Sequence, residues 1–210
     1  MNGNAYSLAG SSALVTGGNS GIGKACSLAL AKAGAAVAIN YVTDADIAQQ
    51  MAGEIAAAGG KALAVAGDVG REAEVKAMFN RVQAEFGGLD ILVNNAGIQR
   101  DSPLVDMTLQ QWTAVIETNL TGQFLCAREA ARLFIGRGLD PKRSPAAGKI
   151  ICMSSVHQQI PWSGHVNYAA SKGGVAMLVK TLAQELAPQR IRVNAVAPGA
   201  IQTPLNRAAW

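Results

Sequence analysis

The chain has 210 residues, of which 50% are hydrophobic and 15% charged, with a formal net charge of +4 at pH 7. A chain of this length and apolar content can bury a sizeable core, and we expect a single domain over residues 1–210. The densest basic spot, Lys142 and Arg143, lies in a Gly- and Pro-rich stretch. A solvated loop accounts for that spot better than a nucleic-acid patch, so no nucleic-acid partner is expected.

Three cysteines, Cys26, Cys126 and Cys152, stand far apart in apolar segments. Their odd number and wide spacing argue against a disulfide framework or a metal site, so we expect free thiols, no metal and a cytoplasmic location. The N-terminus has neither a basic start nor an apolar stretch, and no run of roughly 18 apolar residues follows it. We therefore expect a soluble protein without a targeting segment or a membrane partner.

Short apolar runs without polar alternation predict strands buried on both faces. In chain order they are Ala13 to Thr16, Val37 to Tyr41, Ala62 to Ala66, Ile91 to Asn94, Ile150 to Met153 and Ile191 to Ala197. Helical spacing of apolar residues predicts helices over Ile22 to Ala33, Ala45 to Ala58, Glu72 to Phe86, Leu109 to Phe134 and Tyr168 to Leu186. Residues 136–148 are predicted to form a loop. This alternation predicts a doubly wound, Rossmann-type α/β fold, a parallel sheet with helices on both faces and a ligand site at the carboxyl ends of its strands.

The segment Thr16–Gly23, TGGNSGIG, follows the first predicted strand and opens the first helix. Its glycines allow a tight turn and let backbone amides approach a pyrophosphate, whose charge the helix N-terminus favours. Spaced glycines also occur in ordinary strand-to-helix turns. At the first turn of such an alternation, they favour a bound dinucleotide.

Tyr168 and Lys172 stand four residues apart on a predicted helix, and therefore project from one face. A free phenol, with a pKa of about 10, is only about 0.1% ionised at pH 7. Lowering that pKa by about three units needs roughly 4 kcal/mol, which one positive charge at about 4 Å supplies in an effective dielectric of about 20. Such pairs also arise by chance on helix surfaces, but Lys172 is sufficient in magnitude to activate Tyr168.

Together, TGxxxGIG, Asp68-Val69 after the third strand, NNAG at 94–97 and Tyr168-x-x-x-Lys172 resemble the short-chain dehydrogenase/reductase family. The resemblance covers almost the whole chain, with the motifs in the family's order. It implies an NAD(P)-dependent oxidoreductase that passes a hydride between the nicotinamide and an alcohol or carbonyl substrate. It also implies a homo-oligomer, since tetramers are common in this family.

The resemblance further implies the residues that bind the cofactor. The phosphates would be lined by Gly17, Ser20 and Ile22, in the loop that also holds Asn19, Gly21 and Gly23. The adenine would face Asp68 and Val69, and the ribose would lie beside Asn94, Ala96 and Gly97. The nicotinamide would be surrounded by Tyr168, Lys172, Pro198, Gly199, Ile201 and Thr203. From the residues alone, Asn94 and Asn95 suit turn-stabilising amides equally well.

The end of the second strand bears on the choice between NAD and NADP, because a carboxylate there would bind the adenosine ribose hydroxyls. The sequence offers Asn40, Tyr41 and Val42, with neither a carboxylate nor the arginine that often accompanies NADP. The nearest acids, Asp44 and Asp46, suit a helix start. We expect NADP or NAD, with a slight preference for NADP and dual use open.

By resemblance, Asn119, Ser155, Tyr168 and Lys172 form the catalytic set. Ser155 would bind the reacting oxygen, with its neighbour Ser154 as the alternative, and Tyr168 would exchange the proton as general base or acid. Asn119 would hold water for a proton relay toward Lys172. Without the other motifs, an Asn in mid-helix indicates either a kink or a functional amide.

The stretches SSVHQQIPWSGH and APGAIQTPLN resemble the glucose 1-dehydrogenases of this family, which implies a sugar substrate. His157, Gln158 and Trp162 would then border the sugar with Ser155 and Tyr168, and Gln99 stands where the glucose enzymes carry a carboxylate. From the residues alone, His157 and His165 also suit exposed loops, and Trp162 suits loop packing.

Two other functions stay open at this point. One is a carbonyl reductase of the 3-oxoacyl-acyl-carrier-protein type, for which Arg100 is a candidate docking residue. The other is a truncated dinucleotide-binding protein without turnover, because family members continue past Trp210 with a lid helix, another helix and a seventh strand. We expect this chain to lack those last elements.

Overall fold

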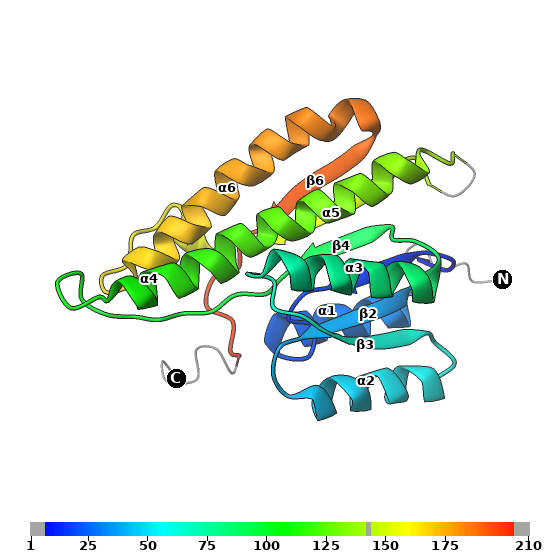
Figure 1. The fold of residues 1–210 in the computed structure, drawn as a ribbon, viewed down its shortest axis with the longest axis horizontal. Helices are drawn as coiled ribbons and strands as arrows, with labels where there is room; N and C mark the ends of the chain where they lie inside the picture. The colour runs from blue at the N-terminus through cyan, green and yellow to red at the C-terminus, as the bar shows by residue number, and fades with distance from the viewer. Residues whose placement is uncertain (1–6, 142–143, 204–210) are drawn as a thin grey trace.

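The structure is a computed structural model that describes residues 7–141 and 144–203. Within these residues, parallel strands form one sheet in the order β3-β2-β1-β4-β5-β6 (Figure 1). The strands are β1 (Ser12–Val15), β2 (Ala36–Tyr41), β3 (Ala62–Ala66), β4 (Ile91–Asn94), β5 (Gly148–Met153) and β6 (Ile191–Val196). The chain winds outward from β1 in both directions, which confirms the doubly wound fold and places its switch point between β1 and β4.

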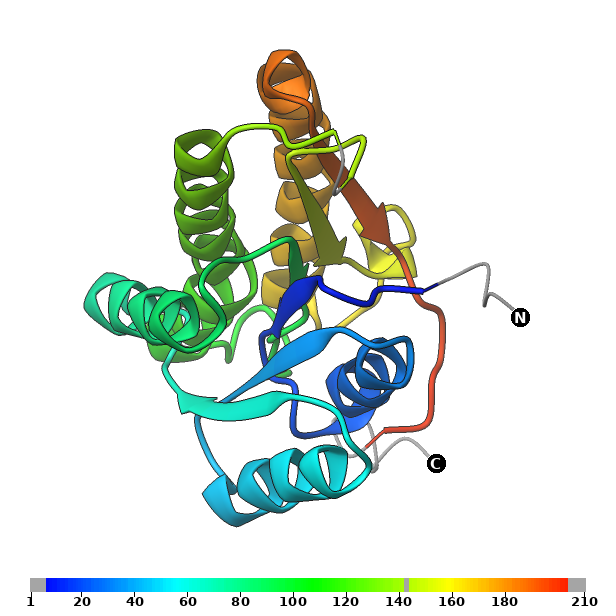
Figure 2. The ribbon, with the colours of Figure 1, turned by 90° about the vertical axis from the view of Figure 1, so that its right-hand side faces the viewer.

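Helices cover both faces of this sheet, as Figure 2 shows in an end-on view. They are α1 (Gly21–Lys32), α2 (Ala45–Ala57), α3 (Glu72–Phe86), α4 (Leu109–Ile116), α5 (Gly122–Arg137) and α6 (Val166–Leu186). Helices α1 and α2 pack on one face through one hydrophobic core, and α3, α5 and α6 pack on the other through a second core.

The two cores explain why the strands are apolar without alternation. In β1, Leu14 belongs to the core under α3, α5 and α6, whereas its neighbours Ala13 and Val15 belong to the core under α1 and α2. Successive side chains of a strand point to opposite faces, and here both faces are covered. The resulting rigid sheet fixes the loops that leave its carboxyl edge.

The predicted helix at 109–134 differs from the observed structure. It is divided by a π-helical turn, Glu117–Thr121, and its second part extends to Arg137, so the predicted loop at 136–148 begins two residues later. Asn119 lies in the π turn with no exposed surface. Single π turns often mark functional sites. The basic pair Lys142 and Arg143 lies outside the described residues.

Residues 7–141 and 144–203 contain neither a helix that could span a membrane nor a cluster of side chains that could hold a metal ion. No helix there has both the length and the apolar character to cross a membrane. No three His, Cys, Asp or Glu side chains gather there in a way that could hold a metal ion.

Candidate active site

The predicted site residues converge where β1, β4 and β5 end. Val15 of β1 pairs with Val93 of β4, and Asn94 of β4 pairs with Cys152 of β5, so the three strands end at one edge. The glycine-rich loop, the NNAG loop and the Ser154–Gln158 segment leave the sheet there. Ligands of doubly wound sheets bind in this position.

The glycine-rich loop has the backbone shape that a pyrophosphate needs. Gly17 and Gly21 have φ values of +57° and +50°, a region that glycine adopts at low cost. A Cβ on Gly23 would collide with the carbonyl oxygen of Gly17. Ser20 precedes α1, is exposed, and makes no side-chain cap to the helix. The first turn of α1 thus keeps amides that fit a phosphate group.

The side-chain amides of Asn40 and Asn95 hold this loop in place, and only for Asn95 did the sequence suggest such a turn-stabilising role. Asn40, which is 1% exposed, accepts a hydrogen bond from the Gly17 amide at 3.1 Å and donates to the Gly67 carbonyl at 2.9 Å. The side chain of Asn95 donates to the carbonyl oxygens of Thr16 and Gly17. A polar residue inside an apolar strand, as Asn40 is, was the available signal, since buried amides need partners.

The side chain of Asn19, a residue expected in the cofactor-binding loop, contacts the backbone of the segment after β2. Its side-chain amide donates to the carbonyl oxygens of Thr43 and Asp44, at 2.9 and 3.3 Å. Asp44 is the N-cap residue of α2, as the sequence suggested, but it has a φ of +58° and its side chain makes no cap hydrogen bond. Asn19 therefore joins the glycine-rich loop to the segment after β2, next to the half-buried Tyr41.

The two residues expected near the adenine follow β3. Val69 is buried in the core below α3 and α5. Asp68 accepts a hydrogen bond from the Gly70 amide at 2.9 Å and forms an ion pair with Arg71 at 3.5 Å. The half-buried carboxylate of Asp68 thus shapes the turn, which leaves part of its acceptor capacity for a ligand.

Helix α6 brings Tyr168 and Lys172 to one face, as their spacing predicted. They are 9% and 3% exposed, and the ammonium nitrogen lies 5.5 Å from the centroid of the Tyr168 ring. The Lys172 ammonium also donates to the Met153 carbonyl, at 2.8 Å. The end of β5 therefore fixes the lysine relative to the tyrosine.

Burial dominates the ionisation of both groups. It raises the pKa of Tyr168, while the Ser155 hydroxyl lowers it in part and the charge of Asp101 raises it further. Burial also lowers the pKa of Lys172 from 10.5 to about 8, which leaves the amine mostly protonated at pH 7. A positive charge lowers the pKa of Tyr168 below its ordinary value only after it has offset the rise that burial causes. The extent of that burial could not be predicted from the sequence.

Asn119 and Gly97 complete the surroundings of the lysine. Asn119 accepts a hydrogen bond from the Ile98 amide at 2.8 Å and donates to the Ile98 carbonyl at 3.0 Å and to Ser171 at 3.2 Å. A Cβ on Gly97 would lie 3.3 Å from the Asn119 oxygen and 3.7 Å from the Lys172 ammonium. Glycine at 97 thus lets this loop approach both side chains closely.

The two neighbouring serines have distinct partners. The hydroxyl of Ser154 donates to Gln158 at 2.7 Å, so the expected substrate residue Gln158 is turned toward Ser154. Ser155 accepts a hydrogen bond from the His157 amide at 3.2 Å. The Ser155 hydroxyl also forms a hydrogen bond with Tyr168 that lowers the pKa of the phenol. Ser155, rather than Ser154, therefore lies beside the tyrosine.

Aromatic rings line one side of Tyr168. His157 meets the Tyr168 ring edge-on, with centroids 6.3 Å apart, and stacks on Trp162 at 4.6 Å. His165 stacks on Trp162 as well, at 3.6 Å. Gln99 is half-buried in the loop after β4, and the Arg100 guanidinium folds back onto its carbonyl oxygen. The sequence did not predict that His165 stacks on Trp162.

The segment after β6 borders the site from the other side. The amide of Val156 donates to the Pro198 carbonyl at 3.1 Å, which holds the start of this segment against the end of β5. Gly199 and Ile201 are exposed and Thr203 is half-buried. In Figure 2 the segment (red) runs from β6 to the side of the sheet that carries α1.

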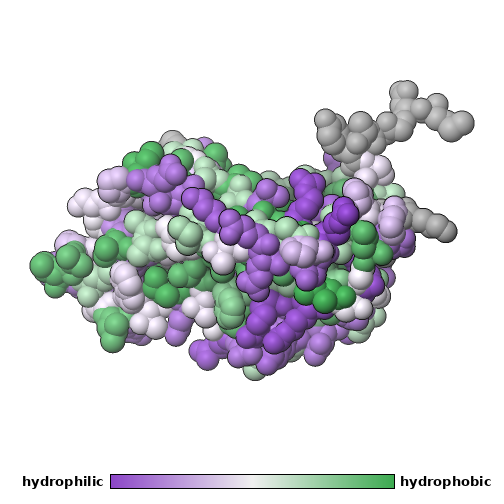
Figure 3. All heavy atoms as spheres, turned by 90° about the horizontal axis from the view of Figure 1, so that it is seen from above, coloured by the Kyte–Doolittle hydropathy of each residue, from purple (hydrophilic) through white to green (hydrophobic). Residues whose placement is uncertain are grey.

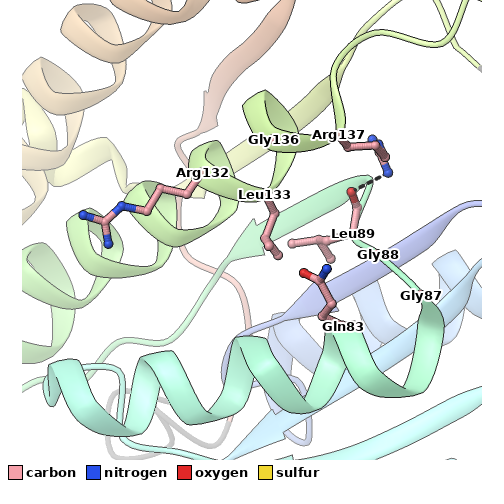
Figure 4. Close-up of a pocket in the computed structure, with 8 residues that line it drawn as sticks. All are labelled: Gln83, Gly87, Gly88, Leu89, Arg132, Leu133, Gly136 and Arg137. Atoms are coloured by element: carbon pink, nitrogen blue, oxygen red, sulfur yellow. Dashed lines mark hydrogen bonds between the residues drawn. The ribbon is translucent and has the colours of Figure 1, made fainter.

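Two hollows lie at the opposite, amino end of the strands. One, of about 250 Å³, lies between the ends of α3 and α5 (Figure 4). There Arg137 donates to the Leu89 carbonyl and pairs with Asp90, while the Arg132 side chain points away from the hollow. The other, of about 510 Å³, lies beside Lys61 and Phe86. Neither is near Tyr168, so we do not assign the chemistry to them.

The chain matches the family model described as short chain dehydrogenase over residues 11–210. 3beta-hydroxysteroid dehydrogenase 1 of Eggerthella lenta is 44% identical over 199 residues, which are 95% of this chain and 74% of that protein. The 3-oxoacyl-acyl-carrier-protein reductase of a Synechocystis species is 43% identical over 193 residues, or 92% of this chain and 75% of that protein.

A solved structure has the same fold. A gluconate 5-dehydrogenase from Burkholderia cenocepacia, in complex with NADP and tartrate, matches with a TM-score of 0.88 and 39% identity, over 97% of this chain and 76% of that chain. Together with the family model, these similarities make the chain a member of the short-chain dehydrogenase/reductase family, an NAD(P)-dependent oxidoreductase.

Proposed function

We propose that the chain interconverts an alcohol and a carbonyl compound at Tyr168, with Ser155, Lys172 and Asn119 as the other catalytic residues. The observation that carries the proposal is the position of Tyr168 and Lys172 on one face of α6, with Ser155 beside the tyrosine. This group lies at the same sheet edge as the glycine-rich loop, which fits the phosphates of a dinucleotide. A bound nicotinamide would therefore lie within reach of Tyr168.

The residues would act in the following way during oxidation. Ser155 donates a hydrogen bond that orients the substrate oxygen, and Tyr168 takes the hydroxyl proton as general base. Lys172 supplies a positive charge that favours the ionised phenol, and Asn119 holds the Ile98 loop beside it. A nicotinamide held at this edge would supply the hydride acceptor, and in reduction the same residues would work in reverse.

We propose NADP or NAD as the cofactor, with a slight preference for NADP. The end of β2 offers Tyr41, followed by Val42, where a carboxylate would exclude the 2′-phosphate. Asn19 fixes this segment through the carbonyl oxygens of Thr43 and Asp44. That the gluconate 5-dehydrogenase was solved with NADP supports the same preference.

For the substrate, we propose a small polyhydroxylated compound, a sugar such as glucose or a sugar acid. Support comes from His157, whose ring lies edge-on to Tyr168, from the half-buried Gln99 in the loop after β4, and from the gluconate 5-dehydrogenase among the similar structures. The alternative is a 3-oxoacyl-acyl-carrier-protein-type reductase, favoured by the 43% identity to such an enzyme.

A coenzyme assay would test these proposals. The purified protein is incubated with NADP or NAD and with glucose, gluconate, a 3β-hydroxysteroid or a 3-hydroxyacyl carrier protein, and absorbance at the reduced-nicotinamide band is followed. We expect the fastest reduction with a sugar or sugar acid and NADP. Turnover of the acyl carrier protein alone would favour the alternative, and no turnover of any compound would contradict the proposed activity.

We also propose that the protein is a homo-oligomer. Large apolar side chains are exposed on α4, α5 and the loop before α4. Figure 3 shows hydrophobic surface at the end of the molecule where α4 and the loop before it lie. They are Leu104, Val105, Leu109, Phe124 and Ile135. Exposed large apolar side chains of this kind are a reason to propose a subunit interface.

A further inference from the structure

The loop between β5 and α6 carries three stacked rings beside Tyr168. The indole of Trp162 lies parallel to the His165 imidazole, with an interplanar angle of 9° and centroids 3.6 Å apart. His157 stacks on the same indole at 4.6 Å and 23°. Two imidazoles this close to one indole would overlap if they shared a face, so they cover its opposite faces. The two imidazoles therefore cover part of each Trp162 face, and the His157 ring lies edge-on to that of Tyr168.

Both ring nitrogens of His165 face groups that only accept hydrogen bonds. Nδ1 lies 2.8 Å from the carbonyl oxygen of Ser163, and Nε2 lies 3.2 Å from a carboxylate oxygen of Asp101. A neutral imidazole has one N–H and can serve one of these acceptors. The two contacts are both hydrogen bonds when His165 is an imidazolium and Asp101 a carboxylate.

Asp101 is held at this place independently of its own charge. The carbonyl oxygen of Arg100, on one side, accepts from the Asn167 side chain at 2.8 Å. The amide of Ser102, on the other side, donates to the carbonyl oxygen of Gly164 at 3.0 Å. Three consecutive residues of the loop after β4 thus contact the start of α6. A substitution that removes the charge of Asp101 or His165 leaves these backbone anchors.

We propose that His165 is a positioning residue for the reaction proposed above: as an imidazolium paired with Asp101, it clamps the Trp162 indole and thereby fixes His157 against Tyr168. The inference rests on the proposed function only for its effect on catalysis. The charged or titratable groups around the pair are His157 across the indole and Tyr168 on α6. The Arg100 guanidinium is turned to the Gln99 carbonyl.

The pair also balances charge near the tyrosine. The carboxylate of Asp101 raises the pKa of Tyr168, so it opposes the ionisation that a general base requires. A positive charge on His165, in contact with that carboxylate, offsets this effect. Loss of the His165 charge alone would leave Asp101 uncompensated, whereas loss of both charges would restore the balance.

The first test measures protonation and needs no turnover. The chain has two histidines, so ¹⁵N-labelled protein gives two imidazole spin systems, and His165→Gln identifies the His165 signals. At pH 7 we expect both nitrogens of His165 to carry protons, and Asp101→Asn to convert the ring to a neutral form. Asp106→Asn, which removes an exposed charge five residues away, should leave the ring charged. A singly protonated His165 ring in the wild-type protein would overturn the proposal.

The second test separates charge from loop structure in the coenzyme assay. His165→Gln keeps a donor for Asp101 but removes the charge, so the alkaline-rising limb of kcat/KM should move up by about half a pH unit. Adding Asp101→Asn should move the limb back. The proposal is contradicted if the alkaline-rising limb of His165→Gln lies at the wild-type pH, or if adding Asp101→Asn does not return the limb to that pH. If the wild-type protein turns over none of the substrates, the proposed function fails, and the ring signals still decide the role of His165.

Discussion

At the scale of single residues, the pairing of Tyr168 with Lys172 determines how the site depends on pH. Burial raises the pKa of Tyr168 and lowers that of Lys172 to about 8. Below that pH the ammonium is charged and favours the ionised phenol, and above it this support is lost. The phenol and the amine are thus coupled, and each can be tested by removing the other.

Replacing Lys172 with Ala should move the alkaline-rising limb of kcat/KM for alcohol oxidation to higher pH, because burial then acts on the phenol without a nearby positive charge. The pH dependence of initial rates measures this shift. Lys180→Ala, an exposed lysine on the same helix, is the matched control. A limb at the wild-type pH in Lys172→Ala would refute the electrostatic role.

The lowered pKa of Lys172 also has a consequence for stability. Because the folded pKa, about 8, lies below the ordinary 10.5, the unfolded chain binds more protons between these values, and stability should rise with pH across that window. The cost of the buried charge at pH 7 is on the order of 3 kcal/mol before any compensation by its hydrogen bond.

Lys172→Met removes this charge with little change of volume, so it should raise the free energy of unfolding at pH 7 by about 1–3 kcal/mol and flatten the dependence above pH 8. Urea unfolding at pH 7 and pH 10 measures both effects. An unchanged slope between pH 8 and 10 would show that the amine does not carry the lowered pKa.

At the scale of elements, we propose that the turn from β1 to α1 positions the cofactor and that the end of β2 selects it. Tyr41 is the last residue of β2, and Asn19 holds the carbonyl oxygens of the segment that follows. Asn19 therefore links the glycine-rich loop to the segment that follows β2.

Tyr41→Asp should shift the preference at least tenfold toward NAD. The new carboxylate accepts hydrogen bonds from the ribose hydroxyls of NAD but repels the 2′-phosphate of NADP, and about 1.4 kcal/mol of discrimination gives a factor of ten. Fluorescence titration of both cofactors against wild type and variant measures the ratio, and Tyr41→Phe controls for loss of the hydroxyl. An unchanged ratio would mean that residue 41 does not face the ribose.

Gly23→Ala should abolish cofactor binding, because the added Cβ would collide with the Gly17 carbonyl oxygen and displace the loop. Gly53→Ala is the matched control, since nothing lies within 4 Å of a Cβ in α2 there. The control should keep its affinity and gain about 0.5–1 kcal/mol of helix stability. Titration and thermal unfolding of both variants check the pair, and wild-type affinity in Gly23→Ala would contradict the described loop.

At the scale of the whole molecule, the sheet was predictable because it is covered on both faces. Continuous apolar runs such as Ile91 to Asn94 predict buried strands, and the apolar residues between these runs have helical spacing, which predicts helices. The π turn at Asn119 was foreseen only as a choice between a kink and a functional amide, because helical periodicity does not encode the bonds that Asn119 makes to Ile98.

The tertiary partners in the site were not predictable from one sequence. The spacing of Tyr168 and Lys172 gave their shared face, but the lysine's bond to Met153 depends on the end of β5. The contact between Asp101 and His165 joins loops that lie 64 residues apart in the sequence, and no local pattern marks it. Local patterns thus located the site, whereas its ionisation depends on contacts between distant segments.

Tyr168→Phe tests the proton-transfer assignment most directly, once the coenzyme assay has identified a substrate. The substitution removes only the phenolic oxygen, so the affinity for the cofactor, measured by fluorescence, should stay within about twofold of wild type, while kcat falls by roughly 10²–10⁴-fold. Retention of more than about a tenth of the wild-type kcat, with cofactor binding intact, would contradict the role of Tyr168 as the proton-transferring residue.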